Sequence, residues 1–224
     1  MNYCEPKHPF DGYDELMDAD YKDMMEFIIK AESIQAKGLG EWIINNIDLS
    51  NSVEGQKSII DIGCGPGLYL LPYEAAGYEI HGIDACSLAG GLLKKENFVR
   101  TDLRFPYAPS HKYNLAICFE VAEHLEEHWA DRLIDTICSC ADIVLFTGAV
   151  PGQGGTFHLN EQPHSYWLQK FQERHAFMIH PQHQLMRNFL EGYRALVVTG
   201  EVSGWIINNS FLLHKEILAP ADTR

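Results

Sequence analysis

The sequence predicts an α/β protein built on a doubly wound, Rossmann-like sheet that is mainly parallel. Short apolar runs alternate along the chain with stretches of helical periodicity, which is the pattern of repeated β–α–β units. Gly63, Gly65 and Gly67 follow the first apolar run, and closely spaced glycines at a strand end let the backbone turn sharply. With 224 residues, of which 46% are hydrophobic, the chain is long enough for one such domain with a full core.

The apolar runs place the seven expected strands. They are predicted at residues 58–60, 78–84, 98–103, 113–121, 142–150, 176–180 and 204–216. The run at 113–121 is apolar enough to be buried in a parallel sheet. Helices are predicted at 20–47, where Gly38-Leu39-Gly40 is expected to divide the segment in two, and at 68–76, 126–140 and 165–175.

Composition argues against two classes of partner. The formal charge is −14 and the pI is near 5.1, and the longest basic run is Lys94-Lys95, so nucleic acid is an unlikely partner. No apolar run approaches membrane-spanning length and residues 1–6 do not resemble a signal peptide, so we expect a cytoplasmic protein with no membrane partner. Its six cysteines are then expected to be free thiols, and Cys138-Ser139-Cys140 lacks the second pair that a zinc site needs.

The stretch Asp61-Ile62-Gly63-Cys64-Gly65-Pro66-Gly67 is the most informative motif. A dinucleotide fingerprint needs glycine at the first, third and sixth positions, whereas the sixth position here is Leu68, which disfavours an NAD-dependent oxidoreductase. No Lys-Ser or Lys-Thr pair follows, which excludes a P-loop. The pattern resembles motif I of the class I S-adenosylmethionine (SAM) dependent methyltransferases, and the resemblance covers roughly residues 58–150.

Acidic residues follow the next two predicted strands. Asp84 closes the second strand and can accept hydrogen bonds from both hydroxyls of a ribose, and Asp102 follows the third strand, where a carboxylate can accept from an adenine amino group. The resemblance implies SAM as cofactor, S-adenosylhomocysteine (SAH) as product, and an antiparallel last strand. The cofactor-binding residues that it implies are Asp61, Gly63, Cys64, Gly65, Gly67, Asp84, Ala85, Asp102, Leu103 and Phe119.

The acceptor side is expected at the end of the fourth strand. Residues 119–125 resemble the E-V-x-E-H-L stretch of small-molecule O-methyltransferases, including those of ubiquinone biosynthesis. His124 is a candidate general base because the ordinary pKa of histidine lies near the operating pH, although it could instead cap or pack the next helix. Glu120, His158 and His164 are the other catalytic candidates.

A second segment, residues 156–167, resembles the H-x-N-x-Q-P-x-x-Y-W segment of a broad group of methyltransferases. It is expected to direct His158, Asn160 and Gln162 toward the acceptor, and residues 152–155 are expected to flex as a gate. Residues 205–211 resemble the final strand of the same group.

The predicted function is SAM-dependent methyl transfer to a small-molecule acceptor, on a hydroxyl. One alternative is a metal-dependent RNA 2′-O-methyltransferase, in which Glu120, Glu123 and His124 would bind a divalent ion with His158 or His164; we expect no metal, since the same motif is common in metal-free relatives. Another alternative is a non-catalytic SAM- or nucleoside-binding protein. Neither the acceptor nor the oligomeric state follows from the sequence.

The chain is expected to divide into two parts. Residues 1–50 are predicted to form an N-terminal helical cap, and residues 51–224 the SAM-binding domain. Tyr13 and Tyr21 are candidates for covering the methionine end of the cofactor.

Overall fold

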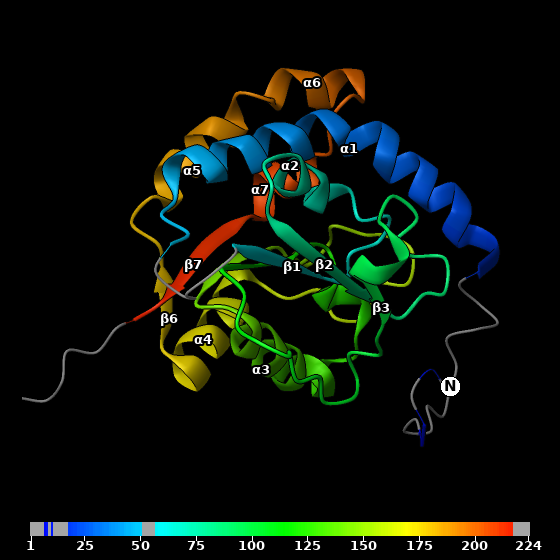
Figure 1. The fold of residues 1–224 in the computed structure, drawn as a ribbon. Coiled ribbons are helices and arrows are strands. Elements are labelled where there is room, and N and C mark those ends of the chain that lie inside the picture. The colour runs from blue at the N-terminus through cyan, green and yellow to red at the C-terminus, as the bar shows by residue number, and fades with distance from the viewer. Residues whose placement is uncertain (1–6, 9, 11–17, 51–56, 217–224) are drawn as a thin grey trace, which may run out of the picture.

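The computed structural model describes residues 7, 8, 10, 18–50 and 57–216 (Figure 1). Its centre is one seven-stranded sheet with the strand order β3-β2-β1-β4-β5-β7-β6. The strands are β1 (Ser58–Ile62), β2 (Glu79–Asp84), β3 (Phe98–Arg100), β4 (Leu115–Cys118), β5 (Ile143–Phe146), β6 (Phe177–Ile179) and β7 (Phe211–Lys215).

The sheet has the predicted topology. Strand β1 pairs in parallel with both β2 and β4, and β7 pairs antiparallel with both β5 and β6. The chain order along the sheet reverses between β1 and β4, and ligands of doubly wound sheets bind in the crevice outside such a reversal. The antiparallel pairing of β7 with β5 and β6 confirms the predicted antiparallel last strand.

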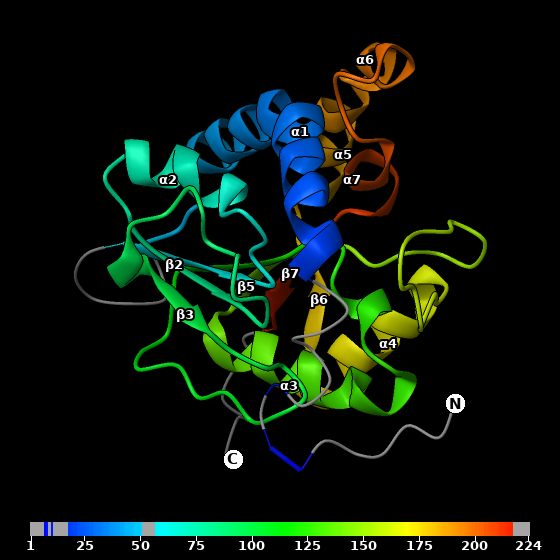
Figure 2. The same ribbon diagram turned by 90° about the vertical axis from the view of Figure 1, so that its right-hand side faces the viewer.

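Helices cover both faces of the sheet (Figures 1 and 2). The α-helices are α1 (Asp18–Asn46), α2 (Leu71–Ala75), α3 (Ala130–Cys140), α4 (His164–His175), α5 (His183–Glu191), α6 (Arg194–Thr199) and α7 (Gly204–Asn209). Short 3₁₀ turns are η1 (Leu68–Leu70), η2 (Lys95–Asn97), η3 (Ala122–His124) and η4 (Glu127–Trp129). In Figure 2 the N-terminal end of α1 lies close to the ends of the strands.

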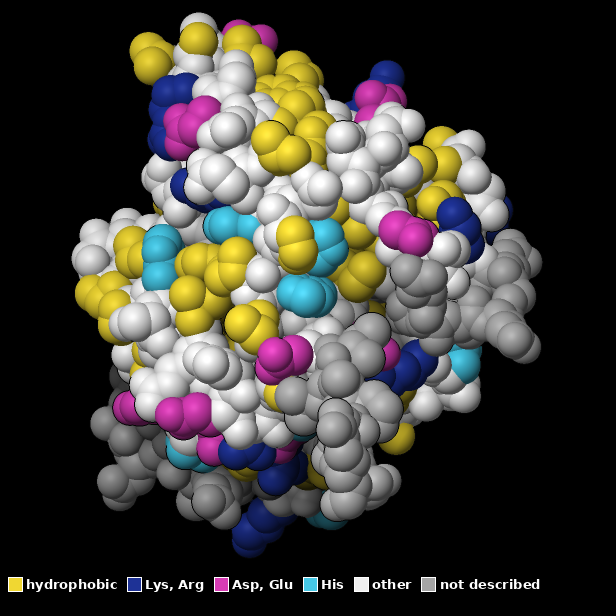
Figure 3. Space-filling view, turned by 90° about the vertical axis from the view of Figure 1, so that its left-hand side faces the viewer, with side chains coloured by type: hydrophobic (Ala, Val, Ile, Leu, Met, Phe, Trp, Pro, Cys, Tyr) yellow, Lys and Arg dark blue, Asp and Glu magenta, His cyan; other side chains and the backbone are white. Residues whose placement is uncertain are grey.

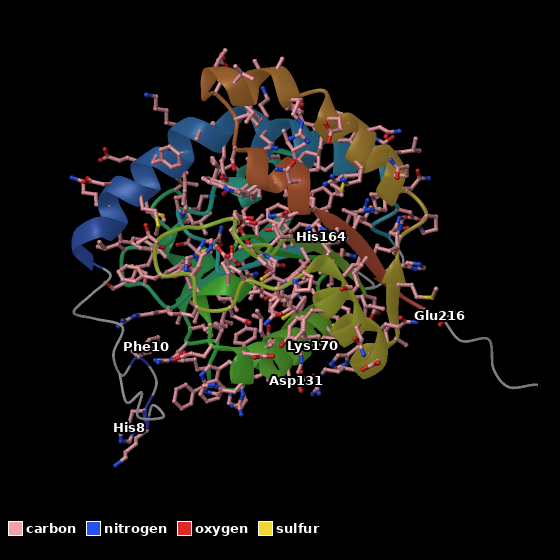
Figure 4. The ribbon with its side chains drawn as sticks, turned by 180° about the vertical axis from the view of Figure 1, so that it is seen from behind. His8, Phe10, Asp131, His164, Lys170 and Glu216 are labelled. Atoms are coloured by element: carbon pink, nitrogen blue, oxygen red, sulfur yellow. The ribbon has the colours of Figure 1, made fainter. Side chains whose placement is uncertain are left out.

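Alternate residues of each strand pack into two separate hydrophobic layers, because successive side chains of a strand point to opposite faces of the sheet. Ile60, Ala116 and Val144 pack in the layer that contains α3 and α4. Their neighbours in sequence, such as Ile59, pack in the layer that contains α1, α2, α5 and α7. An ion pair between Lys170 of α4 and Asp131 of α3, labelled in Figure 4, joins the two helices of the first layer.

The predicted division of residues 20–47 into two helices is wrong, since α1 runs without a break. Gly38 and Gly40 allow α1 to pack closely against Tyr193 and Pro72. A Cβ atom at Gly38 would lie 1.8 Å from the Tyr193 hydroxyl, and one at Gly40 would lie 2.5 Å from Pro72 Cβ. A glycine inside a helix that has a packing partner at this distance does not need to end the helix.

The predicted long strand at 204–216 is also wrong. Residues 204–209 form α7, and only 211–215 form β7. The side chain of Ser203 caps α7 by accepting a hydrogen bond from Trp205 N at 3.3 Å, and this local signal competes with the β-branched run that follows it. Helices α5 and α6 were not predicted either.

Two further expectations concern cysteines and membranes. Of the cysteines in the described residues, Cys64, Cys86, Cys118, Cys138 and Cys140 are buried, and none of them belongs to a disulfide. Tyr13 and Cys4 lie outside the described residues. In residues 18–50 and 57–216, no helix has the length and apolar character needed to cross a membrane.

Figure 3 shows the side on which α5, β6 and β7 lie in Figure 1, where histidine and hydrophobic side chains gather next to one another.

Candidate active site

A cavity of about 510 Å³ opens at the carboxyl ends of the strands beside the chain-order reversal. Its walls come from the N-terminal half of α1, the loop after β1, the ends of β2 and β4, the loop after β5, and α7. This volume lies in the range of small-molecule sites, and the position is the one that ligands occupy in this class of sheet.

Most of the predicted site residues meet at this cavity. Those that line it are Asp61, Gly63, Cys64, Gly65, Asp84, Ala85, Leu103, Phe119, Glu120, His124 and His158. Gly67, Asp102 and His164 do not line it, and neither do Asn160 and Gln162. Among the described residues the chain therefore brings together cofactor and acceptor candidates that lie up to 97 positions apart, from Asp61 to His158.

The glycine loop fixes one end of the cavity. Gly63 and Gly65 have φ angles of +74° and +51°, a left-handed conformation that glycine adopts without steric cost. A Cβ atom at Gly63 would lie 2.3 Å from Val121 Cγ2, whereas one at Gly65 would meet nothing nearer than Met25 Sδ at 3.6 Å. Gly63 thus permits close packing, and Gly65 leaves open space for a ligand.

Asp84 is held at the mouth of this loop by backbone amides. Gly65 N donates to its Oδ2 at 2.9 Å and Cys86 N donates to its Oδ1 at 2.8 Å. Each carboxylate oxygen keeps further acceptor capacity for a ligand hydroxyl. Burial raises the pKa of Asp84 to about 6, while the backbone amides oppose that rise.

Asp61 lies deeper in the same end of the cavity. Burial, together with the nearby charge of Asp84, raises its pKa to about 8. The cofactor end therefore presents two carboxylates, and neither is paired with a cation in the described structure. A buried carboxylate without a counter-ion favours a ligand that brings hydrogen-bond donors or positive charge.

The structure places Asp102 away from the cavity. Its carboxylate accepts hydrogen bonds from Arg104 Nη2 at 2.8 Å and from Phe10 N at 2.9 Å. The charge of Arg104 and these hydrogen bonds lower the pKa of Asp102 against the opposing effect of burial. Its neighbour Leu103 does line the cavity, so contact with an adenine through Asp102 stays a prediction that requires the Arg104 pair to rearrange.

The acceptor end is organised around Glu120, which follows β4 with a φ of +52°. Its amide donates to Thr147 Oγ1 at 2.7 Å, and its Oε2 accepts from Gln153 Nε2 at 2.8 Å. Asn209 Nδ2 in turn donates to Gln153 Oε1 at 2.7 Å. A non-glycine residue in the left-handed region costs free energy, so the surrounding bonds hold Glu120 in place.

His164 belongs to this network, although it does not reach the cavity. Its Nε2 lies 3.2 Å from Asn209 Oδ1, and its ring contacts Phe211 with centroids 5.0 Å apart. Figure 4 labels it at the start of α4, near the junction of α7 and β7. His164 therefore contacts Asn209, the first residue of the hydrogen-bond series that runs through Gln153 to Glu120.

His124 and His158 face each other across the acceptor end, with ring centroids 5.1 Å apart. Burial and the neighbouring His158 lower the pKa of His124 to about 4, so it is neutral at physiological pH. The Nδ1 of His158 lies 2.9 Å from Glu161 Oε1, and since a carboxylate only accepts, this nitrogen carries the proton. The Nε2 atom of His158 is then left as an acceptor.

Glu161 is a site residue that the sequence reasoning missed. Besides His158 it holds the loop after β5, because Gly152 N and Gly154 N each donate to its carboxylate at 2.7 Å. These bonds to His158 and the two amides lower the pKa of Glu161. The loop after β5 is therefore bound to Glu161 by two backbone hydrogen bonds, and its movement as a gate stays a prediction.

Glu123, His124 and His158 form a group that could hold a metal ion. Their ligand atoms all lie within 4.8 Å of one another. Glu123 is fully buried, neither of its carboxylate oxygens has a hydrogen-bond partner, and burial and Glu120 raise its pKa well above the ordinary value. Carboxylate oxygen and imidazole nitrogen are ordinary ligands of divalent metals, so the donor set fits such an ion.

Helix α1 contributes a second missed group. Glu32 and Tyr69 both line the cavity, and the Tyr69 hydroxyl donates to Glu32 Oε2 at 2.9 Å. Trp205 and Ile206 of α7 complete the wall beside them. One sequence signal was available, since Glu32 lies on the apolar stripe of α1 at the four-residue spacing from Ile28.

The family is shown by a direct match. Residues 31–189 match the family model described as "Methyltransferase domain", which is well over half of the chain. The chain belongs to this methyltransferase family. The matched region contains the glycine loop, Asp84, Glu120 and His158, while the parts of the cavity wall from residues 21–28 and 205–206 lie outside it.

Curated relatives and solved structures agree with this family. A ubiquinone biosynthesis O-methyltransferase of Rickettsia felis is 33% identical over 93 residues, and the match spans 38% of each chain. The corresponding enzyme of Aromatoleum aromaticum is 28% identical over 119 residues, covering 49% of this chain and 47% of the relative. The chain thus matches less than half the length of these relatives.

Two solved methyltransferases share the fold. Magnesium protoporphyrin IX methyltransferase (ChlM) from Synechocystis PCC 6803 with bound SAH has a TM-score of 0.55 at 18% identity, covering 72% of this chain and 85% of that one. The plantazolicin methyltransferase BpumL, also with SAH, has a TM-score of 0.55 at 12% identity and covers 89% of each chain. SAM is the methyl donor of the class I family. The Asp84 carboxylate can accept hydrogen bonds from the ribose hydroxyls of SAM, and Gly65, which has no side chain, lets SAM approach the backbone closely.

Proposed function

We propose that the protein transfers the methyl group of SAM to a hydroxyl group of a small molecule. The observation that carries this proposal is that one cavity has the glycine loop and Asp84 at one end and His124 and His158 at the other. SAM supplies the electrophilic methyl group. The protein must hold the donor, align the acceptor oxygen with it and remove a proton.

At the donor end the chain's own groups supply binding and orientation. Asp84 accepts from the ribose hydroxyls, since its oxygens are already aimed by the amides of Gly65 and Cys86. Asp61 and the loop at Gly65 lie against the rest of the donor. The first half of α1, with Tyr21 and Met25 on the cavity wall, covers this end as a lid.

His158 is the proposed proton acceptor. Its Nδ1 is committed to Glu161, which fixes the tautomer and leaves Nε2 to take the proton of the acceptor hydroxyl. His124 was the first candidate from the sequence, but a pKa of about 4 makes it a weaker base than an ordinary histidine. We assign His124 to the wall that orients His158.

The acceptor is a small molecule rather than RNA in this proposal. The support is the cavity itself, the net charge of −14, and the names of the relatives, which are O-methyltransferases of ubiquinone biosynthesis. Recognition of a phosphate backbone would need lysines and arginines, and none lines the described cavity.

The test measures transfer of labelled methyl groups from SAM to a panel of phenols, catechols and sugar alcohols. We expect His158→Ala to lower kcat by about 100-fold or more, while SAH affinity stays unchanged, because general base catalysis contributes about 10²–10⁴-fold. His128→Ala is the matched control on an exposed histidine. SAH binding with no transfer to any acceptor would favour the non-catalytic alternative.

The same assay separates a base from a metal ligand. If Glu123, His124 and His158 bind a divalent ion, chelation with EDTA abolishes transfer and Mg²⁺, Mn²⁺ or Zn²⁺ restores it. If His158 is the base, EDTA leaves the rate unchanged. His158→Ala alone would lower the rate in both cases, so the EDTA arm decides between them.

A further inference from the structure

The charge on the cavity wall restricts the acceptor. Of the residues that line the described cavity, Glu32, Asp61, Asp84 and Glu120 carry carboxylates, and none is lysine or arginine. Burial raises the pKa of Asp61 to about 8, so this group is mainly protonated at pH 7, which leaves the carboxylates of Glu32, Asp84 and Glu120. One SAM molecule has a single net positive charge, so it cannot balance three carboxylates, and a ligand that brings a second positive charge reduces the imbalance.

Two of these carboxylates come from segments other than β1, the glycine loop and β2. Glu32 comes from α1 and is 7% exposed, and Glu120 comes from the end of β4. They are close enough for the charge of Glu120 to add to burial in raising the pKa of Glu32 to about 7. Bringing a cation between two such groups is favourable, because each carboxylate is costly to bury without a partner.

Each carboxylate is aimed by a neutral partner rather than neutralised by a cation. The Tyr69 hydroxyl donates to Glu32 Oε2 at 2.9 Å, and Gln153 Nε2 donates to Glu120 Oε2 at 2.8 Å. The other oxygen of Glu120, Oε1, is buried and has no hydrogen-bond partner. Both glutamates line the cavity, so an N–H group of a ligand can donate to their carboxylates.

Aromatic side chains border the same space. The rings of Tyr69 and Phe119 pack edge to face with centroids 4.9 Å apart, and both line the cavity together with Trp205. Aromatic faces attract cations, and the attraction grows when the cation is withdrawn from water. Carboxylates beside aromatic rings are therefore a suitable lining for a protonated amine.

Neither of the other cations proposed for this cavity accounts for Glu32. The metal candidate comprises Glu123, His124 and His158, and Glu32 is not a member of it. The positive groups of SAM have Asp61 and Asp84 at the glycine-loop end. Glu32 comes from helix α1, and its bond is to the Tyr69 hydroxyl.

We propose that the methyl acceptor carries a positively charged amine, which is bound between Glu32 and Glu120 beside Tyr69 and Phe119. The inference rests on the proposed function, because it names the substrate class of the same cavity. Acceptors that carry a carboxylate or phosphate near this position are excluded by repulsion from the two glutamates.

The test uses three phenols that share a ring and differ at the end of a two-carbon side chain. Tyramine carries an ammonium group, tyrosol a neutral hydroxyl, and 4-hydroxyphenylacetate a carboxylate. Each is titrated by calorimetry into SAH-saturated protein at about pH 8, where the amine is charged and Glu32 is ionised. We expect tyramine to bind at least about 10-fold more tightly than tyrosol, and the carboxylate to bind most weakly.

Variants assign the preference to the two glutamates. Glu32→Gln and Glu120→Gln should each reduce the advantage of tyramine over tyrosol to about threefold or less, with SAH affinity unchanged. Glu26→Gln, on the exposed face of the same helix, should retain the full advantage. Unchanged SAH binding also shows that each variant is folded.

Several outcomes would overturn the inference. Tyramine binding no better than tyrosol, or failing to bind, removes the amine site. A preference that survives both glutamine variants places the amine elsewhere. Variants that weaken SAM relative to SAH but leave tyramine unaffected would assign the carboxylates to the sulfonium of SAM. Failure of the wild-type protein to bind SAH is a different result, because it contradicts the proposed function itself.

Discussion

The two glycines Gly63 and Gly65 provide a matched pair of substitutions with different expected effects. In Gly63→Ala the new Cβ lies 2.3 Å from Val121 Cγ2, and the residue keeps a φ of +74°. The left-handed conformation costs about 1–2 kcal/mol and overpacking a further 1–3 kcal/mol, so roughly 2–5 kcal/mol of the free energy of unfolding is lost. Thermal and urea unfolding, followed by circular dichroism, measure this loss.

Gly65→Ala carries only the conformational cost, about 1–2 kcal/mol, because its Cβ meets no atom within 3.6 Å. Its methyl group nevertheless occupies the cavity side of the loop, so we expect weaker SAH binding by calorimetry in a protein that is more stable than Gly63→Ala. The reasoning is refuted if Gly63→Ala unfolds like the wild type, or if Gly65→Ala is the less stable of the two variants.

Three further predictions concern titration and capping. The ionised form of Asp84 accepts the ribose hydroxyls and its pKa is about 6, so SAH affinity should fall as the pH drops below about 6 and stay flat in Asp84→Asn; equal profiles in calorimetry would contradict this. Asp61 has its pKa raised to about 8, so its contribution to stability is present below its unfolded pKa of 3.8 and is lost as the pH rises toward 8. Asp61→Asn should therefore raise Tm at pH 7 by at least about 2–4 °C, with a smaller gain at pH 4. An equal or lower Tm at pH 7 would show that burial of Asp61 does not destabilise the protein. Ala176 ends α4 with a φ of +55°, so Ala176→Gly should stabilise the protein by about 0.5–1 kcal/mol in urea unfolding, whereas a loss of stability would show that the methyl group packs favourably.

The parts of the site that follow a strand directly could be predicted from the sequence. The glycine loop and Asp84 are local features, and a parallel sheet brings the carboxyl ends of its strands to one edge. Asp102 shows the limit of this reasoning. Its place after β3 is correct, but its carboxylate is taken by Arg104 two residues later, and such local competition depends on side-chain conformations.

Contacts between distant segments could not be predicted in the same way. Glu32 reaches Tyr69 across 37 residues, and Asn209 reaches Gln153 across 56. Gly38 and Gly40 indicated a break in α1 because glycine lowers helix propensity, whereas packing against Tyr193 and Pro72 overrides that preference. The division of the chain at residue 50 and the cytoplasmic location stay predictions.

Glu32 illustrates a signal that the sequence does contain. Tyr21, Met25, Ala36, Leu39 and Ile43 mark the buried stripe of α1, and Glu32 and Gln35 interrupt it with polar groups. A charged residue on an apolar stripe requires a partner or a ligand. Here the partner is Tyr69 and the neighbouring space is the cavity, so the interruption marks the site.

The central claim is that the cavity binds SAM through the glycine loop and Asp84. Calorimetric titration of the wild-type protein and of Asp84→Ala with SAH tests it most directly. We expect micromolar binding to the wild type and a loss of at least about 100-fold in the variant, because two hydrogen bonds to a charged group contribute roughly 1.5–3 kcal/mol each. Absence of SAH binding to the folded wild type, or equal affinity of the variant, would contradict the claim.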